Sequence, residues 1–124
     1  MPPGKGMITP GTFAAAATPL VLGILAEGES YGYAILQRVN ALSDGELEWS
    51  DGMLYPLLHR LERLGHVDSA WGESPTGRRR KHYRLSASGE AAFAEQRRQW
   101  DVVSRALHRV WSERGTGDLA LGGA

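Results

Sequence analysis

Residues 50–85 carry two hydrophobic periodicities in direct succession. The first spaces five leucines three or four residues apart, as on one face of an α-helix: Leu54, Leu57, Leu58, Leu61 and Leu64. Gly65 follows as a helix terminator, and residues 66–71 and 81–85 then have the composition of two short strands. The segment 72–77 between them is rich in glycine, serine and proline and predicts a hairpin tip. A helix followed by such a hairpin is the order of elements in a winged helix.

The residues that follow the predicted hairpin tip are strongly basic. Residues 78–84 carry five formal positive charges and no acid. A solvated charged turn is the ordinary interpretation of such a run. Here a glycine-rich turn precedes the charges and a strand follows them, so they lie where the phosphates of a nucleic acid could reach them. We therefore predict DNA contacts for the four basic residues nearest the tip: Arg78, Arg79, Arg80 and Lys81.

The face of the predicted helix opposite the leucines indicates a second contact with DNA. At about 100° per residue, that face carries Gly52 and His59, with Tyr55 on its flank. We expect this edge to approach base edges in a major groove, mainly through Tyr55 and His59. Ser50, the predicted N-cap, and Arg60 would lie near phosphates. The alternative is an ordinary surface helix, because few exposed groups on this face offer hydrogen bonds.

The charge distribution supports the same region as the contact surface. The formal net charge of the 124-residue chain is zero. Residues 54–85, however, hold seven basic residues against three acids, a local charge of +4, whereas residues 1–53 hold two against six. The field that a phosphate backbone meets depends on this distribution and not on the sum.

The sequence offers little support for catalysis or for a membrane location. It has no cysteine, its four histidines are scattered, and it has neither a Gly-x-Ser-x-Gly elbow nor a glycine-rich phosphate loop. No apolar run reaches the roughly 20 residues of a membrane span. We expect a cytoplasmic, non-enzymatic protein without a cofactor or a metal site.

The last predicted helix carries a coiled-coil pattern. Ser86 is its expected N-cap and residue 114 its approximate end. Two series of residues seven apart interleave into a seam: Phe93, Trp100 and Leu107 with Gln96, Val103 and Val110. Such a seam predicts dimerisation, with an interface of Phe93, Trp100, Val103, Leu107 and Val110. Trp100 either packs in the dimer core or lines a site for a flat ligand.

The remaining segments complete the predicted organisation. We divide the chain into an N-terminal arm, flexible or partly helical (1–17), a DNA-binding domain (18–85), a dimerisation helix (86–114) and a flexible tail (115–124). The DNA-binding domain begins with helices at 20–26 and 31–42, the second capped by Ser30. Its apolar face comprises Ile35, Leu36, Val39 and Leu42. Residues 46–49 alternate polar and apolar and predict a short strand.

Three groups of residues together resemble the PadR-type transcriptional regulators. They are Leu25-Ala26-Glu27-Gly28 with Tyr31-Gly32-Tyr33, Leu54-Tyr55-Pro56 with Arg60-Leu61-Glu62, and the run 77–86 with Gly89. The likeness covers roughly residues 18–111 in one uninterrupted order, and the length of the last helix is similar to the compact multidrug-binding repressors of that family.

The resemblance implies a homodimeric repressor that binds a palindromic operator in double-stranded DNA and releases it when a small molecule binds. It implies DNA contacts for Tyr33 and Tyr55 as well as for the basic hairpin residues. It also implies that Trp100 stacks on small planar hydrophobic effectors, and we place Gln96 and Val103 beside it in that site.

The prediction is therefore a mainly α fold with a small β-wing: a winged helix-turn-helix followed by a long C-terminal dimerisation helix. Its expected role is sequence-specific transcriptional repression relieved by an effector. The alternative is a winged helix that serves protein–protein assembly without binding DNA.

Overall fold

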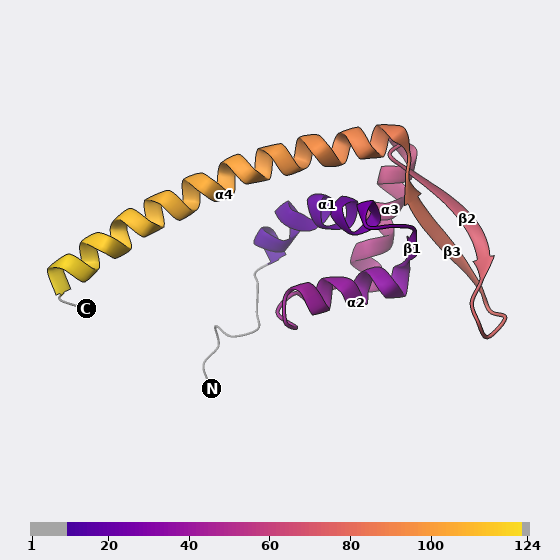
Figure 1. The fold of residues 1–124 in the computed structure, drawn as a ribbon. Helices are drawn as coiled ribbons and strands as arrows, with labels where there is room; N and C mark the ends of the chain where they lie inside the picture. Colours follow the sequence, from indigo (N-terminus) through magenta and orange to yellow (C-terminus); the bar gives the residue numbers. More distant parts are fainter. Residues whose placement is uncertain (1–9, 123–124) are drawn as a thin grey trace. The chain divides into compact units, whose positions relative to one another are not determined.

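The computed structural model describes the backbone of residues 10–122 and the side chains of residues 11–114. The elements follow the order α1 (Pro10–Ala26), β1 (Ser30–Tyr31), α2 (Gly32–Leu42), α3 (Asp51–Arg63), β2 (Val67–Glu73), β3 (Arg79–Leu85) and α4 (Ala87–Gly122) (Figure 1). The described residues divide into two compact units, one ending at Phe93 and the other beginning at Ala94.

The core of the first unit is built mainly by the helices that the periodicity predicted. The leucine stripe of α3 is buried at Leu54, Leu57, Leu58 and Leu61. It packs with apolar residues of α1, α2 and the sheet: Phe13, Val21, Leu22, Ile24, Leu25, Ile35, Val39, Val67 and Tyr83. Two residues predicted to face inward do not, because Leu64 and Leu42 end their helices and are 58% and 51% exposed.

The segment before α3 is not the predicted strand. Residues 46–49 have irregular backbone, although their exposure alternates as in a strand, because no neighbouring strand pairs with them. Trp49 instead packs against Phe13, with ring centroids 5.0 Å apart. Phe13 is buried on α1, which begins at Pro10, so residues 10–17 of the predicted arm are helical.

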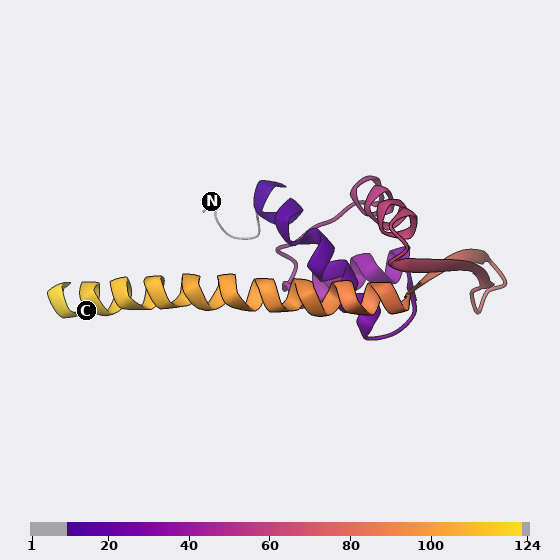
Figure 2. The same ribbon diagram turned by 90° about the horizontal axis from the view of Figure 1, so that it is seen from above.

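The three strands form one antiparallel sheet in the order β1-β3-β2. The two-residue strand β1 was not predicted, and the expected cap Ser30 pairs in it with Tyr83, while Tyr31 is the N-cap of α2. We call β2, β3 and the turn between them the wing. Its turn closes with a hydrogen bond from the Ser74 amide to the Arg78 carbonyl, 2.8 Å, and Figure 2 shows the wing extending beyond α1, α2 and α3.

A dense junction joins the wing to the start of α4. The Ser86 hydroxyl donates to the Gly65 carbonyl, 2.5 Å, and accepts from the Gly89 amide, 3.0 Å, which confirms Ser86 as the N-cap. Gly89 has no room for a side chain, since a Cβ there would overlap the His66 carbonyl. At its other end α4 continues to Gly122, beyond the predicted end near residue 114, because isolated glycines weaken a helix without having to end it. No helix in the described range has the length and apolar character of a bilayer span.

Candidate nucleic-acid interface

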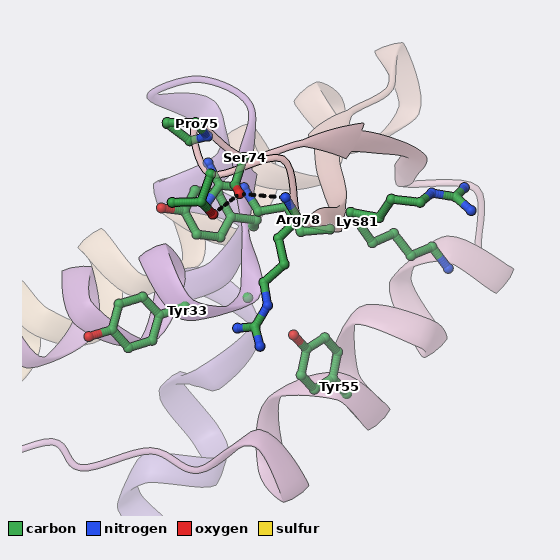
Figure 3. A pocket seen from close by; sticks show the side chains of 11 residues that line it. Tyr33, Tyr55, Ser74, Pro75, Arg78 and Lys81 are labelled. Atoms are coloured by element: carbon green, nitrogen blue, oxygen red, sulfur yellow. Dashed lines mark hydrogen bonds between the residues drawn. The ribbon is translucent and has the colours of Figure 1, made fainter.

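Three segments that are distant in sequence meet around a surface cavity of about 610 Å³. The start of α2 contributes Tyr33, α3 contributes Tyr55, and the wing contributes Arg78. Figure 3 shows the Arg78 side chain directed toward the space between the two tyrosines. The Arg78 guanidinium and the Tyr55 hydroxyl at one concave surface are donors suited to a phosphate group, and the Tyr33 side chain lines the same cavity.

The absence of a side chain at Gly32 lets α3 approach α2 at this cavity. A Cβ on Gly32 would overlap the hydroxyl and ring of Tyr55, so only glycine allows the ring to lie against the first residue of α2. Tyr33 is 63% exposed, and its hydroxyl accepts a hydrogen bond from Gln37 Nε2, 2.9 Å away. Gly32 therefore allows the Tyr55 hydroxyl to lie beside the start of α2, next to Tyr33.

The exposed face of α3 is the face that the sequence predicted. Gly52 and His59 are exposed, and Tyr55 is half-buried with its ring centroid 6.4 Å from that of His59. Arg60 is exposed and its Nη2 donates to the hydroxyl of Thr18, 3.4 Å away.

Ser50 occupies the N-cap position of α3, as predicted, but its side chain makes no capping hydrogen bond. The side chain is exposed, at the end of the helix that carries the predicted base-reading residues.

The four basic residues of the wing that were predicted to contact DNA fall into two pairs. Arg78 and Arg79 are exposed, and the Arg79 guanidinium lies 5.1 Å from the centroid of the Trp71 ring. Arg80 and Lys81 are half-buried. The Arg80 guanidinium lies 3.5 Å from the centroid of the Tyr31 ring, and its Nε is buried without a hydrogen-bond partner.

Lys81 faces an acid of α3. Its Nζ lies 3.8 Å from Glu62 Oε1. The sequence predicted all four basic residues as DNA contacts, whereas the structure presents two of them to solvent and packs two against the body of the unit.

The sequence did not predict the roles of three residues near the interface. Tyr31, Glu62 and Trp71 each contact one of the wing cations, and Trp71 is 61% exposed. Tyr31 belongs to the Tyr-Gly-Tyr run and Glu62 is one of three acids in the basic region 54–85, but neither pattern specifies a cross-strand or helix-to-sheet contact.

Behind the interface, Tyr83 closes the core of the first unit. Burial raises the pKa of its phenol above the ordinary value, and the nearby Tyr55 and Glu62 raise it further. On the outside of the unit, Arg38 forms a two-point ion pair with Glu27, with N–O distances of 3.0 and 2.7 Å. This pairing lowers the pKa of the Glu27 carboxyl.

The second unit is the part of α4 that carries the predicted seam. Its apolar residues are exposed along the helix: Trp100, Val102, Val103, Leu107, Val110 and Trp111. Gln96 lies in the same heptad series and is half-buried. Phe93, predicted at the dimer interface, belongs to the first unit and packs against its core.

The family model of the transcriptional regulator PadR-like family matches residues 21–95, which hold the whole interface described above. The chain belongs to the PadR-like family of transcriptional regulators. It is accordingly a regulator and not an enzyme.

Known proteins similar to this PadR-like regulator agree with that assignment. Transcriptional regulator Rv3488 of Mycobacterium tuberculosis is 37% identical over 85 residues, which is 68% of this chain and 76% of that protein. A PadR-like transcriptional regulator of Bacillus cereus superimposes with a TM-score of 0.73 at 25% identity, over 82% of this chain and 96% of its own. A PadR family transcriptional regulator of Eggerthella lenta superimposes with a TM-score of 0.66 at 30% identity, over 82% and 86% of the two chains.

Proposed function

We propose that this PadR-like regulator is a homodimeric repressor that binds a palindromic operator in double-stranded DNA and releases it when a small planar hydrophobic molecule binds. The observation that carries the proposal is the meeting of Arg78, Tyr33 and Tyr55 at one concave surface. That surface adjoins the exposed face of α3, so base and backbone contacts could be made together.

The wing supplies the contact with the DNA backbone. Arg78 and Arg79 are exposed, whereas Arg80 and Lys81 are engaged by Tyr31 and Glu62. Each phosphate neutralised by a cation contributes a slope of about −0.9 to the dependence of log affinity on log salt. Arg78 and Arg79 would therefore contribute a slope of about −2 per wing, and Arg80 and Lys81 would contribute less.

The face of α3 supplies the contact with bases. Gly52 leaves room for close approach, and His59 and Tyr55 offer hydrogen-bonding groups that can distinguish base edges in a major groove. Ser50 and Arg60 lie at the edges of that face, in positions suited to the flanking phosphates.

A dimer with two-fold symmetry would place one α3 helix on each half of a palindromic operator. Four of the exposed apolar residues of α4 lie at heptad spacing, which is the pattern that packs against a second copy: Trp100, Val103, Leu107 and Val110. Two copies of α3 would then enter successive major grooves, roughly 34 Å apart.

The effector site of the proposal lies at Trp100, with Gln96 and Val103 beside it in the seam. Trp100 is 36% exposed in the single chain, so its indole is accessible to a flat ligand or to a partner copy. A ligand held between two copies would change their separation, and by linkage it would weaken DNA binding by the factor by which DNA weakens its own binding. The cytoplasm is the compartment that such a role requires.

Selection of genomic fragments that bind the purified protein tests the proposal. The expected result is a set of palindromic fragments whose affinity falls steeply with salt and whose complex contains two protomers. Isothermal titration with planar hydrophobic compounds, with and without the selected operator, then measures the coupling. A folded dimer that retards no fragment at low salt would refute DNA binding and favour protein–protein assembly.

A further inference from the structure

Glu62 contacts both strands of the wing. Its Oε2 accepts a hydrogen bond from the Ser69 hydroxyl of β2, 2.6 Å, and its Oε1 lies 3.8 Å from Lys81 Nζ of β3. Glu62 is on α3, the helix that carries the predicted base-reading residues. One carboxylate therefore links that helix to both strands of the hairpin that carries the exposed arginines.

The strand register explains why these contacts converge. Ser69 pairs with Tyr83 and Trp71 pairs with Lys81, so Ser69 and Lys81 lie on the same face of the sheet. That face is directed toward the core, because Tyr83 is buried. The side chains of Lys81 and Glu62 are 31% and 36% exposed, so solvent screens their attraction less than that of a fully exposed pair.

The opposite face of the wing is held by a different group. Arg80 belongs to the alternate face of β3 and lies over the ring of Tyr31, which pairs through β1 with His82. The wing is thus fixed to β1 on one face and to α3 on the other. Val67 and Tyr83 pack the root of the wing against the leucines of α3, and Glu62 adds a polar contact from that helix to both strands.

Electrostatics alone disfavours an acid in this place. A carboxylate within the basic region 54–85 repels the phosphates that Arg78 and Arg79 would bind. We infer that Glu62 is a positioning residue, which fixes the wing at one angle to α3 so that backbone and base contacts fall in register on the operator. This inference rests on the DNA binding proposed above.

A charge-matched pair of variants separates positioning from simple repulsion. E62Q removes the negative charge and the ion pair with Lys81, while its amide oxygen can still accept from Ser69; E62A removes both contacts. D68N removes the same charge from an exposed position on the alternate face of β2. If Glu62 only repels DNA, E62Q will tighten binding to operator and unrelated duplex alike, as D68N does.

Positioning predicts the opposite result on the operator. The preference for operator over unrelated duplex should fall about tenfold in E62A and by a smaller factor in E62Q, and should be unchanged in D68N. An E62A variant that keeps the full preference overturns the inference. Circular dichroism of each variant shows that the fold is retained.

A second measurement needs no DNA. The chain has no cysteine, so T76C in the wing turn and H59C on α3 allow spin labels at two exposed positions. Labelled protein mixed with excess unlabelled chain gives the distance within one protomer. We expect a narrow distribution in the parent and D68N and a broadened one in E62A. An unchanged distribution in E62A overturns the inference, whereas an unaltered chain that binds no duplex refutes only the proposed function.

Discussion

The Arg80 guanidinium lies over the Tyr31 ring, 3.5 Å from its centroid, and so binds the wing to the strand that precedes α2. A cation held against a ring and partly removed from water has less freedom to pair with phosphate than one on the open surface. Adjacent arginines in one basic run therefore have different roles.

Arg78→Ala and Arg80→Ala should differ in how they change DNA binding. Loss of Arg78 should reduce the magnitude of the salt slope by about 0.9 per protomer, since a phosphate contact is lost. Loss of Arg80 should leave the slope nearly unchanged and lower the free energy of unfolding by about 1 kcal/mol. Anisotropy titrations across a salt series and urea denaturation measure the two effects. Equal slopes for the two variants would contradict the division of the wing cations.

Gly32→Ala should destabilise the protein, whereas Gly52→Ala should not. A methyl group at Gly32 overlaps Tyr55, and overpacking of this kind costs about 1–3 kcal/mol. Gly52 lies in the helix, and the only neighbour within 4 Å of a Cβ added there is the Ser50 hydroxyl, at 3.8 Å. Alanine at this position should therefore raise the free energy of unfolding by about 0.5–1 kcal/mol. Denaturation curves measure the free energy of unfolding of both variants. It should fall in Gly32→Ala and rise in Gly52→Ala, and changes of the same sign would contradict the prediction.

The pair of Glu27 and Arg38 predicts a small dependence of stability on pH. Hydrogen bonding to Arg38 lowers the pKa of Glu27 below its ordinary value in the folded protein. The pair therefore stabilises the fold above the ordinary pKa of the carboxyl, and this contribution is lost as pH falls through the lowered value. Glu27→Gln should be less stable than the parent at neutral pH, and the two should converge in acid. Because both groups are exposed, high salt should shrink the difference.

Trp100→Phe should remove the quenching of intrinsic fluorescence by planar hydrophobic compounds. The phenyl ring keeps most of the apolar contact, while the indole that would stack on the ligand is gone. Trp111→Phe, on the same helix, is the matched control and should retain quenching. Persistent quenching in the first variant would make Trp100 a packing residue only.

Leu107→Glu should break the proposed homodimer into monomers. Leu107 is 39% exposed in the single chain at a seam position of α4, where a carboxylate would be buried without a partner in a dimer. Sedimentation equilibrium measures the change. Arg97→Glu changes the charge by more but lies outside the seam, so this variant should stay dimeric. If both variants are monomers, the added negative charge alone explains the loss of the dimer.

The elements with strong periodicity were predictable from the sequence, and the contacts between elements were not. The leucines of α3 and the two wing strands follow from spacing and turn residues. The strand β1 has two residues, too few to show any periodicity. Residues 46–49 alternate in polarity and in exposure, but no strand pairs with them, so they form no strand. The different roles of Arg79 and Arg80 depend on Trp71 and Tyr31, which lie across the sheet and carry no signal in the linear order.

The Ser86 junction has a mechanical consequence. The Ser86 hydroxyl joins the turn after α3, at Gly65, to the first turn of α4, at Gly89, and the His66 carbonyl leaves no room for a Cβ at Gly89. A tilt of that first turn would move α3 and the wing together as one rigid piece. In the proposed homodimer, control would then act on the separation of the two copies of the first unit and leave the internal shape of each copy unchanged.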